Sequence, residues 1–452
     1  MWTGSELDAR DGTRTDQVAA LVLRQVERGK LSVGSALPSE RDLAQRLGVS
    51  RATVVRALDR LRGRGVVVTR HGARSVVAPS DRLLDPVAPV SAPGPGGHQL
   101  DLRHGTTAAP HEVETAAGRV TGQHLRSAMT GDGPPPGGSP GLRSALAEHL
   151  TQEGVPTLPS QLTLTNGAAA GLELAVQALD LGPGAALVES PTYPAALGCL
   201  RRHRLEVTGW PAGPTAWDID QLAHLVRRTR PGVIYVQADN HNPTGHSVPE
   251  TSRPDLIELL RRHRVSVISD ETLRPLWLGD ARQPLALSRH RGVISLGSLS
   301  KTVWGGLRVG WIRATQDISR RLQQHPAAAL LAPSAFDELL AAEILDDLEA
   351  IVRRRRRLLR LSLDALAASL GEVRDDVAWQ IPTGGMTAWL ELLHTESAVV
   401  TTAARRLGLL VIPGSMFTAD GFDRRHLRLP FTATPGQLAT AVDLLRQAIA
   451  VS

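Results

Sequence analysis

Residues 296–311 read LGSLSKTVWGGLRVGW, and the lysine in this stretch, Lys301, is unusual for this chain. The chain of 452 residues has 51 lysines and arginines, but only Lys30 and Lys301 are lysines. A primary amine forms a Schiff base with an aldehyde, whereas a guanidinium stays protonated and delocalised and cannot do so. A lone lysine is usually a solvated surface charge. Its retention in an arginine-rich chain instead predicts a covalent site at Lys301.

From about residue 100 onward, short apolar stretches alternate with helical ones. Strands are expected at 185–190, 232–238, 265–269 and 292–298, and helices at 167–181 and 253–264. This alternation predicts an α/β fold with a mostly parallel sheet, in which ligands bind at the carboxyl ends of the strands.

Several residues with ligand-binding chemistry follow these strands. Asp270 is either a helix cap or the partner of a cationic ligand nitrogen, and Tyr193 either stacks on a planar ligand or packs in the core. Backbone amides at an expected helix start, together with hydroxyls and an arginine, suit a phosphate. The phosphate candidates are Gly167, Ala168, Ala169, Ser298, Ser300 and Arg308, and Asn242 can bond a ligand oxygen. Together with Lys301, this set predicts pyridoxal 5′-phosphate (PLP).

The N-terminal segment carries the excess positive charge. Residues 1–78 hold 14 lysines and arginines against 8 acidic residues, which accounts for the net charge of +6 of the whole chain. Such an asymmetry indicates an anionic partner for this segment.

Residues 37–77, LPSERDLAQRLGVSRATVVRALDRLRGRGVVVTRHGARSVV, predict a winged helix-turn-helix. A first helix is expected at 14–29. Ser39, with Asp42 three residues later, predicts a helix start, and Gly48 predicts its end. In the next helix, Val54, Val55, Leu58 and Leu61 are expected to be buried. A two-stranded ribbon with a basic tip should follow, although a small basic helical domain with a solvated face would give a similar pattern.

The motifs LPSERDLA, LGVSRATVVRAL and GVVVTRHG resemble the DNA-binding domain of the GntR family. The resemblance implies DNA contacts from Arg41, Arg51, Thr53, His71 and Gly72. Some members of the family carry arginine where this chain has Val55, and the neighbouring Arg56 is a further candidate.

Most of residues 100–452 resemble the fold-type I aminotransferases. The resemblance implies an internal aldimine of PLP on Lys301 as the catalytic residue. It also implies Asp270 on the pyridine nitrogen, Tyr193 stacked on the ring, Asn242 near the phenolic oxygen, and phosphate contacts from the candidates above. Arg428 in HLRLPF would clamp the carboxylate of an effector or substrate.

Two departures from the aminotransferase pattern concern hydroxyl groups. Thr272 and Leu273 occupy positions where a tyrosine usually donates to the cofactor, and no tyrosine lies near GDGPPPGGSPGLR at 131–143. The changes predict that cofactor binding survives and that transaminase activity is at most vestigial.

The combination resembles the MocR subfamily of GntR regulators. It predicts a multidomain chain: a winged helix-turn-helix at 12–78, a Pro/Gly-rich linker at 79–100 and an aminotransferase-like region at 101–452, with a small subdomain from about 335. The resemblance implies a head-to-tail homodimer that binds operator DNA and senses PLP, an amine or an amino acid at a PLP aldimine on Lys301. The alternatives are an active aminotransferase with an accessory DNA-binding domain and a repressor whose cofactor pocket is only structural.

The chain shows neither a signal peptide nor a membrane-spanning apolar run, so a cytoplasmic protein that makes no membrane contact is expected. Cys199 is the only cysteine, which predicts no disulfide and no metal cluster. The arginine run at 353–357 is expected to form the solvated face of a helix, with DNA contact as the alternative.

Overall fold

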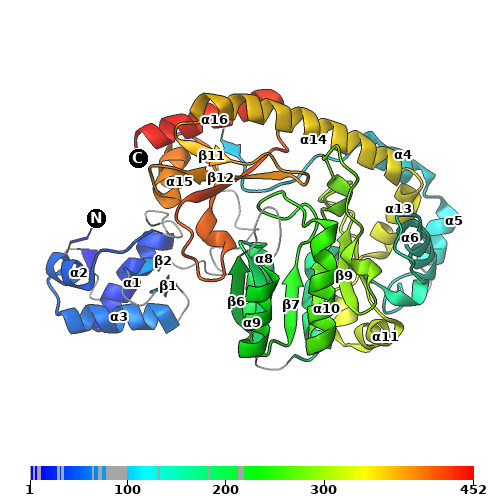
Figure 1. Cartoon of the computed structure of the whole chain (residues 1–452), viewed down its shortest axis with the longest axis horizontal. Helices are drawn as coiled ribbons and strands as arrows, with labels where there is room; N and C mark the ends of the chain where they lie inside the picture. The colour runs from blue at the N-terminus through cyan, green and yellow to red at the C-terminus, as the bar shows by residue number, and fades with distance from the viewer. Residues whose placement is uncertain are drawn as a thin grey trace.

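The computed structural model describes residues 2–3, 6–7, 12–27, 31, 35–63, 66–69, 74–77, 99–129, 133–181, 184–211 and 218–452. A small N-terminal unit lies beside a much larger C-terminal region (Figure 1). The predicted linker at 79–100 lies outside the described residues except for its last two positions.

The N-terminal unit contains three helices and a short ribbon. They are α1 (Arg14–Glu27), α2 (Glu40–Leu47), α3 (Arg51–Gly63) and the antiparallel pair β1 (Val67–Val68) and β2 (Val76–Val77). The Ser39 hydroxyl accepts a hydrogen bond from the Asp42 amide at 3.1 Å, and Gly48 ends α2 at φ 63°. Both predicted ends of α2 are therefore confirmed.

The buried face of α3 differs by one residue from the prediction. Val54, Ala57, Leu58 and Leu61 are buried, whereas Val55 is only half-buried. The four buried positions follow the spacing i, i+3, i+4, i+7 of a helix face, and position 55 lies about 100° away from Val54 around the helix. Ala57 therefore takes the place that the prediction gave to Val55.

A seven-stranded sheet forms the large lobe of the C-terminal region. The order is β4-β10-β9-β8-β7-β5-β6, and β10 runs antiparallel to the other six strands. The predicted strands and the predicted mostly parallel sheet are confirmed. The strands are β4 (Leu162–Thr165), β5 (Ala185–Ser190), β6 (Glu206–Pro211), β7 (Val233–Val236), β8 (Ser266–Asp270), β9 (Val293–Ser298) and β10 (Gly310–Arg313).

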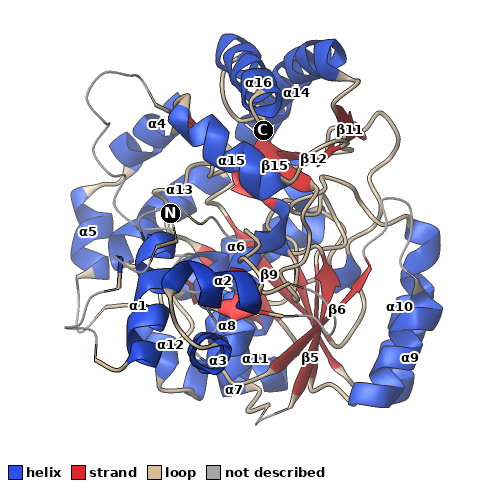
Figure 2. Cartoon of the chain, turned by 90° about the vertical axis from the view of Figure 1, so that its left-hand side faces the viewer, coloured by secondary structure: helices blue, strands red, loops and turns tan. Residues whose placement is uncertain are grey.

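Helices cover both faces of this sheet. On one face, α7 (Gly167–Ala178) and α8 (Pro194–Arg202) pack against alternate strand residues such as Val188 and Tyr235. On the other face, α9 (Ile219–Thr229) and α10 (Arg253–His263) pack against the intervening residues, such as Ile234. Figure 2 shows α9 and α10 on one side of the strands and α7 on the other. The near-continuous apolar strands follow from this two-sided burial.

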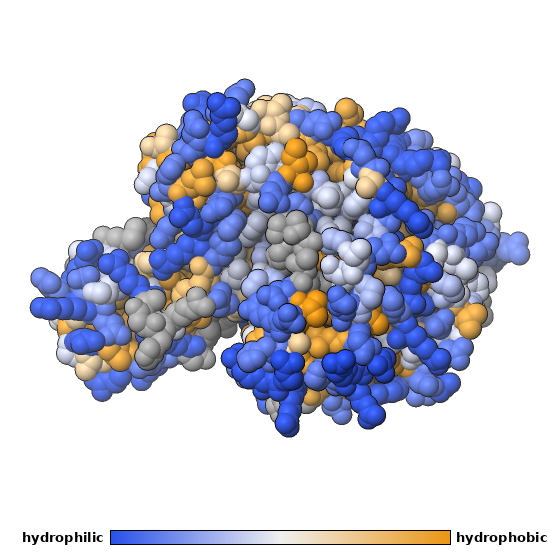
Figure 3. Space-filling model, viewed as in Figure 1, coloured by the Kyte–Doolittle hydropathy of each residue, from blue (hydrophilic) through white to orange (hydrophobic). Residues whose placement is uncertain are grey.

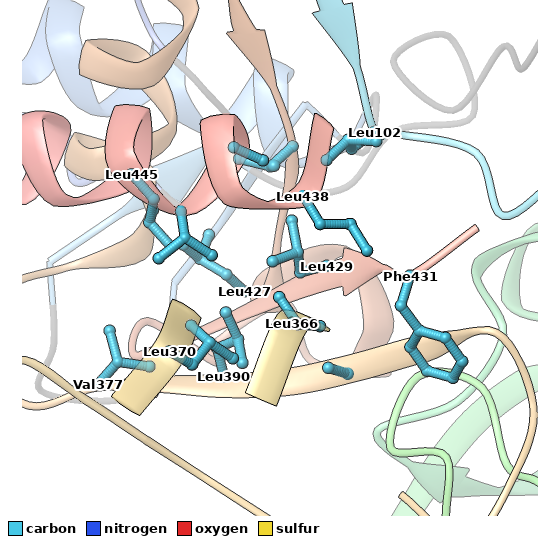
Figure 4. Packing of buried hydrophobic residues seen from close by; sticks show 14 of the residues in the cluster. Leu102, Leu366, Leu370, Val377, Leu390, Leu427, Leu429, Phe431, Leu438 and Leu445 are labelled. Carbon is cyan, nitrogen blue, oxygen red and sulfur yellow. The ribbon is translucent and has the colours of Figure 1, made fainter. Parts of the chain in front are cut away.

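The small lobe has its own sheet and core. Its sheet order is β11 (Val377–Trp379), β12 (Thr387–Leu392), β15 (His426–Pro430), β14 (Ile412–Pro413), all antiparallel. Helices α14 (Leu348–Leu370), α15 (Ser397–Arg406) and α16 (Pro435–Ala450) pack on it. Figure 4 shows leucines of α14, β15 and α16 meeting in this core. Strand β3 (Leu100–Asp101) joins the lobe by pairing in parallel with β13 (Leu409–Leu410).

The change from large to small lobe lies within α14 and not near the expected residue 335. Ile344, Leu348 and Ile351 pack in a large-lobe core with Leu142 and Leu146. Leu359 and the later leucines of α14 pack in the small-lobe core instead. The other helices of the large lobe are α4 (His111–Arg119), α5 (Gly122–Ala128), α6 (Pro140–Gln152), α11 (Gln316–Gln324), α12 (Ala327–Leu330) and α13 (Ala335–Leu345).

The outer face seen in Figure 3 is mainly hydrophilic, with scattered apolar patches. Within the described ranges, no helix combines the length and the apolar character that crossing a bilayer requires.

Candidate functional site

Lys301 lies in the turn that follows β9. Its Nζ donates a hydrogen bond to the backbone carbonyl of Gly105 at 2.9 Å. Burial, and then the nearby Arg428 guanidinium, lowers the pKa of the Lys301 amine to about 8. A larger share of this amine is therefore neutral near pH 7 than of an ordinary lysine, and the neutral form is the nucleophile.

Asp270 ends β8 at the carboxyl edge of the sheet. Its Oδ2 accepts a hydrogen bond from the Tyr235 hydroxyl at 2.8 Å, and its Oδ1 accepts one from the Thr272 amide at 3.0 Å. Burial, and then the Asp270 carboxylate, raises the pKa of the Tyr235 phenol well above its usual value. The phenol therefore stays protonated and orients the carboxylate as a fixed donor.

Tyr235 was missed as a site residue. It lies within the apolar strand β7 and is fully buried, so its sequence context resembles that of a core residue. The available signal was composition: the chain has only two tyrosines, and burial, together with the Asp270 carboxylate, raises the pKa of both.

A second missed residue, Gln237, links Asp270 to Asn242. Its Nε2 donates to the Tyr235 hydroxyl at 3.1 Å, and its Oε1 accepts from the Asn242 backbone amide at 3.0 Å. The Asp270 carboxylate and the backbone of Asn242 therefore belong to one hydrogen-bonded frame.

The candidate phosphate ligands converge at the start of α7. Gly167 adopts φ +79°, and a Cβ there would lie 3.8 Å from the Ser300 hydroxyl oxygen and 4.0 Å from that of Ser298. The two serine hydroxyls lie 3.0 Å apart. Arg308 Nε donates to Asn166 Oδ1, at the N-cap of the same helix, at 3.2 Å. The amides of Ala168 and Ala169 belong to this first turn, which suits an anion.

Arg428 is a buried cation close to Lys301. One nitrogen, Nη1, lies 3.4 Å from Asn242 Oδ1, and Nη2 donates to the Arg103 carbonyl. Its Nε is buried and has no hydrogen-bond partner among the described residues. Burial lowers the pKa of the guanidinium to about 10. A buried donor without a partner is costly, and a carboxylate ligand would satisfy it.

The predicted pocket residues are therefore brought together. Asp270, Arg308 and Arg428 all lie close enough to influence the pKa of both Lys301 and Tyr193.

The arginine run at 353–357 of α14 is predicted to form a solvated face, and this prediction is only partly right. Arg355 is buried and donates to the carbonyls of Thr302, Val303 and Ala108. Arg354 pairs with Glu112, and Arg356 donates to the Pro275 carbonyl. Arg355 thus holds the two residues that follow Lys301, a role that the sequence pattern did not reveal.

In the N-terminal unit, Arg41, Arg51 and Arg56 are exposed and Thr53 is half-buried. Arg51 pairs with Glu40 at 3.1 Å, and the Thr53 hydroxyl lies 2.8 Å from that of Ser50. His71 and Gly72 lie outside the described residues.

Comparisons with known proteins match both parts of the chain. Residues 14–77 match the bacterial regulatory proteins of the gntR family, and residues 100–445 match aminotransferase class I and II. The pyridoxine biosynthesis transcriptional regulator PdxR of Corynebacterium glutamicum is 30% identical over 86% of this chain and 86% of its own length.

The chain belongs to the MocR subfamily of GntR-family regulators, with an aminotransferase class I and II domain.

Among enzymes, the MocR-type chain is similar to the 2-aminoadipate transaminase of Thermus thermophilus, with 31% identity over 64% of this chain and 74% of that protein. Its C-terminal fold matches the structure of LysN, the α-aminoadipate aminotransferase from Thermus thermophilus, complexed with N-(5′-phosphopyridoxyl)-L-leucine. That match has a TM-score of 0.72 and 28% identity and covers 78% of this chain and 92% of LysN.

The aminotransferase family is PLP-dependent, and PLP is the cofactor of this MocR-type fold. The donor set fits it. The buried Thr272 and Thr192 hydroxyls have no hydrogen-bond partner among the described residues, although both adjoin pocket residues. Lys301 supplies a primary amine, Asp270 a carboxylate for a protonated ring nitrogen, and the start of α7 the amides for a phosphate. PLP would add an aldehyde that reacts with amines.

Proposed function

We propose that this regulator binds operator DNA through its N-terminal unit and senses a small molecule at PLP held on Lys301. The effector is PLP itself, or an amine or amino acid that reacts with the bound cofactor. Asp270, Tyr193, Asn242, Ser298, Ser300, Arg308 and the amides of 167–169 would hold PLP, and Arg428 an effector carboxylate.

The observation that carries this proposal concerns the backbone just beyond the linker. Lys301 donates to the Gly105 carbonyl, and Arg428 donates to the Arg103 carbonyl. The two side chains expected to bind cofactor and effector therefore also hold residues 103–105, which continue from the segment that leads to the DNA-binding unit.

Ligands would compete with these backbone contacts. A Lys301 amine that is covalently bound to PLP cannot keep the same hydrogen bond to Gly105, and an Arg428 guanidinium that is engaged by a carboxylate loses a donor for Arg103. A ligand shifts a conformational equilibrium only if it binds the two states with different affinity. This competition supplies such a difference.

The change would reach DNA through the linker. In a head-to-tail homodimer, an altered anchor at 103–105 on each chain would change the spacing of two DNA-binding units on operator half-sites. Transaminase turnover would be vestigial, because Thr272 and Leu273 stand where a tyrosine hydroxyl is usual in the family.

Spectroscopy and DNA binding test the proposal together. We expect PLP to produce a visible absorbance band with wild-type protein and with Lys30→Ala, which removes the only other lysine, but not with Lys301→Ala. PLP, or PLP with an amino acid, should change operator affinity by at least fivefold in the first two proteins only, which is within the usual range of coupling energies. The operator would be sought in DNA that flanks the gene.

The opposing outcomes are distinct. An equal effect of PLP on DNA affinity in Lys301→Ala would refute sensing at Lys301. Repeated turnover of amino acid with a keto-acid acceptor, without any change in DNA affinity, would instead establish the enzyme alternative. If the affinity for DNA depended only weakly on salt concentration, the assignment of the N-terminal unit as the DNA-binding part would be wrong.

A further inference from the structure

Three side chains outside the PLP pocket gather between α7 and α8. Glu173 lies on α7, Cys199 lies on α8, and His203 is the C-cap of α8. One ligand atom from each residue, a carboxylate oxygen, Sγ and a ring nitrogen, lies within 4.8 Å of the other two. The single cysteine predicts no metal cluster, because the sequence does not reveal that these two helices bring three such side chains together.

The spacing on α8 suits a metal. Cys199 and His203 are four residues apart, which places their side chains on one face of a helix, as in other helical zinc motifs. Glu173 approaches from the neighbouring helix, and the two helices share an apolar core through Leu172, Val176 and Leu200. The scaffold therefore holds the ligands without any long loop.

The present hydrogen bonds already aim the three groups at one another. The Cys199 thiol donates to Glu173 Oε2 at 3.3 Å, and His203 Nε2 contacts Glu173 Oε1. The Glu173 carboxylate therefore faces both of the other groups.

We propose that Glu173, Cys199 and His203 form a zinc site, with a water molecule as the fourth ligand. Carboxylate, thiolate and imidazole are all ligands that Zn²⁺ accepts in tetrahedral geometry. The side chains of Glu173 and His203 are about one-quarter exposed, at 23% and 25%, which leaves a route for the ion and for the water.

Binding requires three local changes. His203 Nε2, which carries the hydrogen of its bond to Glu173 Oε1, must pass to the tautomer with the proton on Nδ1, so that Nε2 can bind the ion. The Cys199 thiol must lose its proton, which passes to solvent as the sulfur–zinc bond forms. Arg202, which donates to Glu173 Oε2 at 3.2 Å, must turn away, and its side chain is 54% exposed and so has space to do this. The site would then carry Zn²⁺, one carboxylate and one thiolate, with no net charge.

The ion would restrain both helices. Helix α7 begins at Gly167 among the candidate phosphate ligands, and α8 begins directly after Tyr193. A metal that joins Glu173 to Cys199 and His203 would fix the relative position of these two starting points. The zinc site itself does not depend on the proposed regulatory function.

Cobalt substitution tests the site directly. Full-length protein stripped of metal with a chelator would be titrated with Co²⁺ and, separately, with Zn²⁺ by calorimetry. We expect one ion per chain, a near-ultraviolet band from sulfur-to-cobalt charge transfer, and release of about one proton per ion at neutral pH.

Matched variants localise the binding. His203→Gln should weaken Zn²⁺ binding by more than the roughly 10- to 100-fold typical of an outer-shell partner. His224→Gln, at an exposed position of α9, should leave it unchanged. Cys199→Ser should abolish the charge-transfer band, and circular dichroism would show that each variant is folded.

Absence of the band in folded wild-type protein would overturn the proposal. Equal Zn²⁺ affinity in His203→Gln and wild type would also overturn it. The test needs neither DNA nor PLP, so its failure would leave the proposed regulatory function intact.

Discussion

In the DNA-binding unit, Arg51 and Arg60 keep 73% and 53% of their side chains exposed and pair with Glu40 and Asp16 at the surface. In the PLP-binding region, Arg253 and Arg355 are buried and each donates to several carbonyl groups. Arginine therefore has two different roles in this chain. Exposed guanidiniums are available to a partner and add little stability, whereas buried ones hold the backbone and leave unsatisfied groups behind when removed.

The largest expected effect is on a buried pair. Arg253 donates to Asp239 at 2.7 Å, and both side chains are almost fully enclosed. Arg253→Met should lower the free energy of unfolding by about 3–5 kcal/mol. It would leave the buried Asp239 with Arg274 as its remaining ion-pair partner among the described residues, and it would remove the donor to the Val248, Leu285 and Ala238 carbonyls. Urea denaturation followed by tryptophan fluorescence measures it.

The control for Arg253 lies on the same helix. Arg261 pairs with Glu258 in an exposed position, and Arg261→Met should leave the free energy of unfolding almost unchanged. Equal costs for the two variants would remove the contrast between buried and exposed arginines.

The second expected effect is on the pH dependence of PLP capture by Lys301. With a pKa of about 8 for the Lys301 amine, the neutral fraction rises about tenfold per pH unit below pH 8 and levels off above it. The rate of covalent PLP capture by the apoprotein, followed by stopped-flow absorbance, should share this shape. A rate that climbs without a break to pH 10 would show that burial and Arg428 do not depress this pKa.

The third effect concerns the missed tyrosine. Tyr235→Phe removes the donor to Asp270 and should cost about 1.5–3 kcal/mol of stability, as expected for a hydrogen bond to a charged group. Tyr193→Phe is the matched control, since the Tyr193 hydroxyl makes no hydrogen bond among the described residues. A Tyr235→Phe variant as stable as Tyr193→Phe would contradict the frame around Asp270.

The fourth effect addresses the exposed charges. Arg51→Ala should weaken operator binding by about 1–3 kcal/mol if Arg51 reads a base, or lower the salt slope by about one if it contacts phosphate. The free energy of unfolding of the Arg51→Ala variant should stay within about 1 kcal/mol of wild type. Arg405→Ala, at an exposed position of α15, should change neither the operator affinity nor its salt dependence. Fluorescence anisotropy at several salt concentrations distinguishes a base contact from a phosphate contact.

The smallest effect tests the end of a helix in the DNA-binding unit. Ser39→Ala should destabilise this unit by about 1 kcal/mol, because the Asp42 amide loses its acceptor. Ser39→Asp keeps an acceptor and should restore most of the loss. A destabilisation as large as that of Arg253→Met would indicate that surface groups of this unit matter as much as buried ones.

Local patterns sufficed for much of this fold. The ends of α2 follow from Ser39 and Gly48, and the apolar runs correctly predicted β5, β7, β8 and β9, because capping and two-sided burial leave clear marks in short stretches. The family motifs pointed to pocket residues that the structure brings together around Lys301.

Contacts between distant segments were not predictable in this way. Tyr235 resembles a core residue until β8 brings Asp270 to it, and Arg355 resembles a surface charge until the loop after Lys301 is placed beside it. The same holds for Glu173, Cys199 and His203, whose meeting depends on how two helices pack. Residue spacing along the chain carries little information about such pairs.

Helix α14 has a consequence for cooperativity. Its 23 residues span about 35 Å, with one end in the large-lobe core and the other in the small-lobe core. Neither lobe can melt completely while the whole helix stays folded. The amides near the middle of α14 should therefore exchange with solvent only when the entire C-terminal region opens, as one foldon with a single opening free energy.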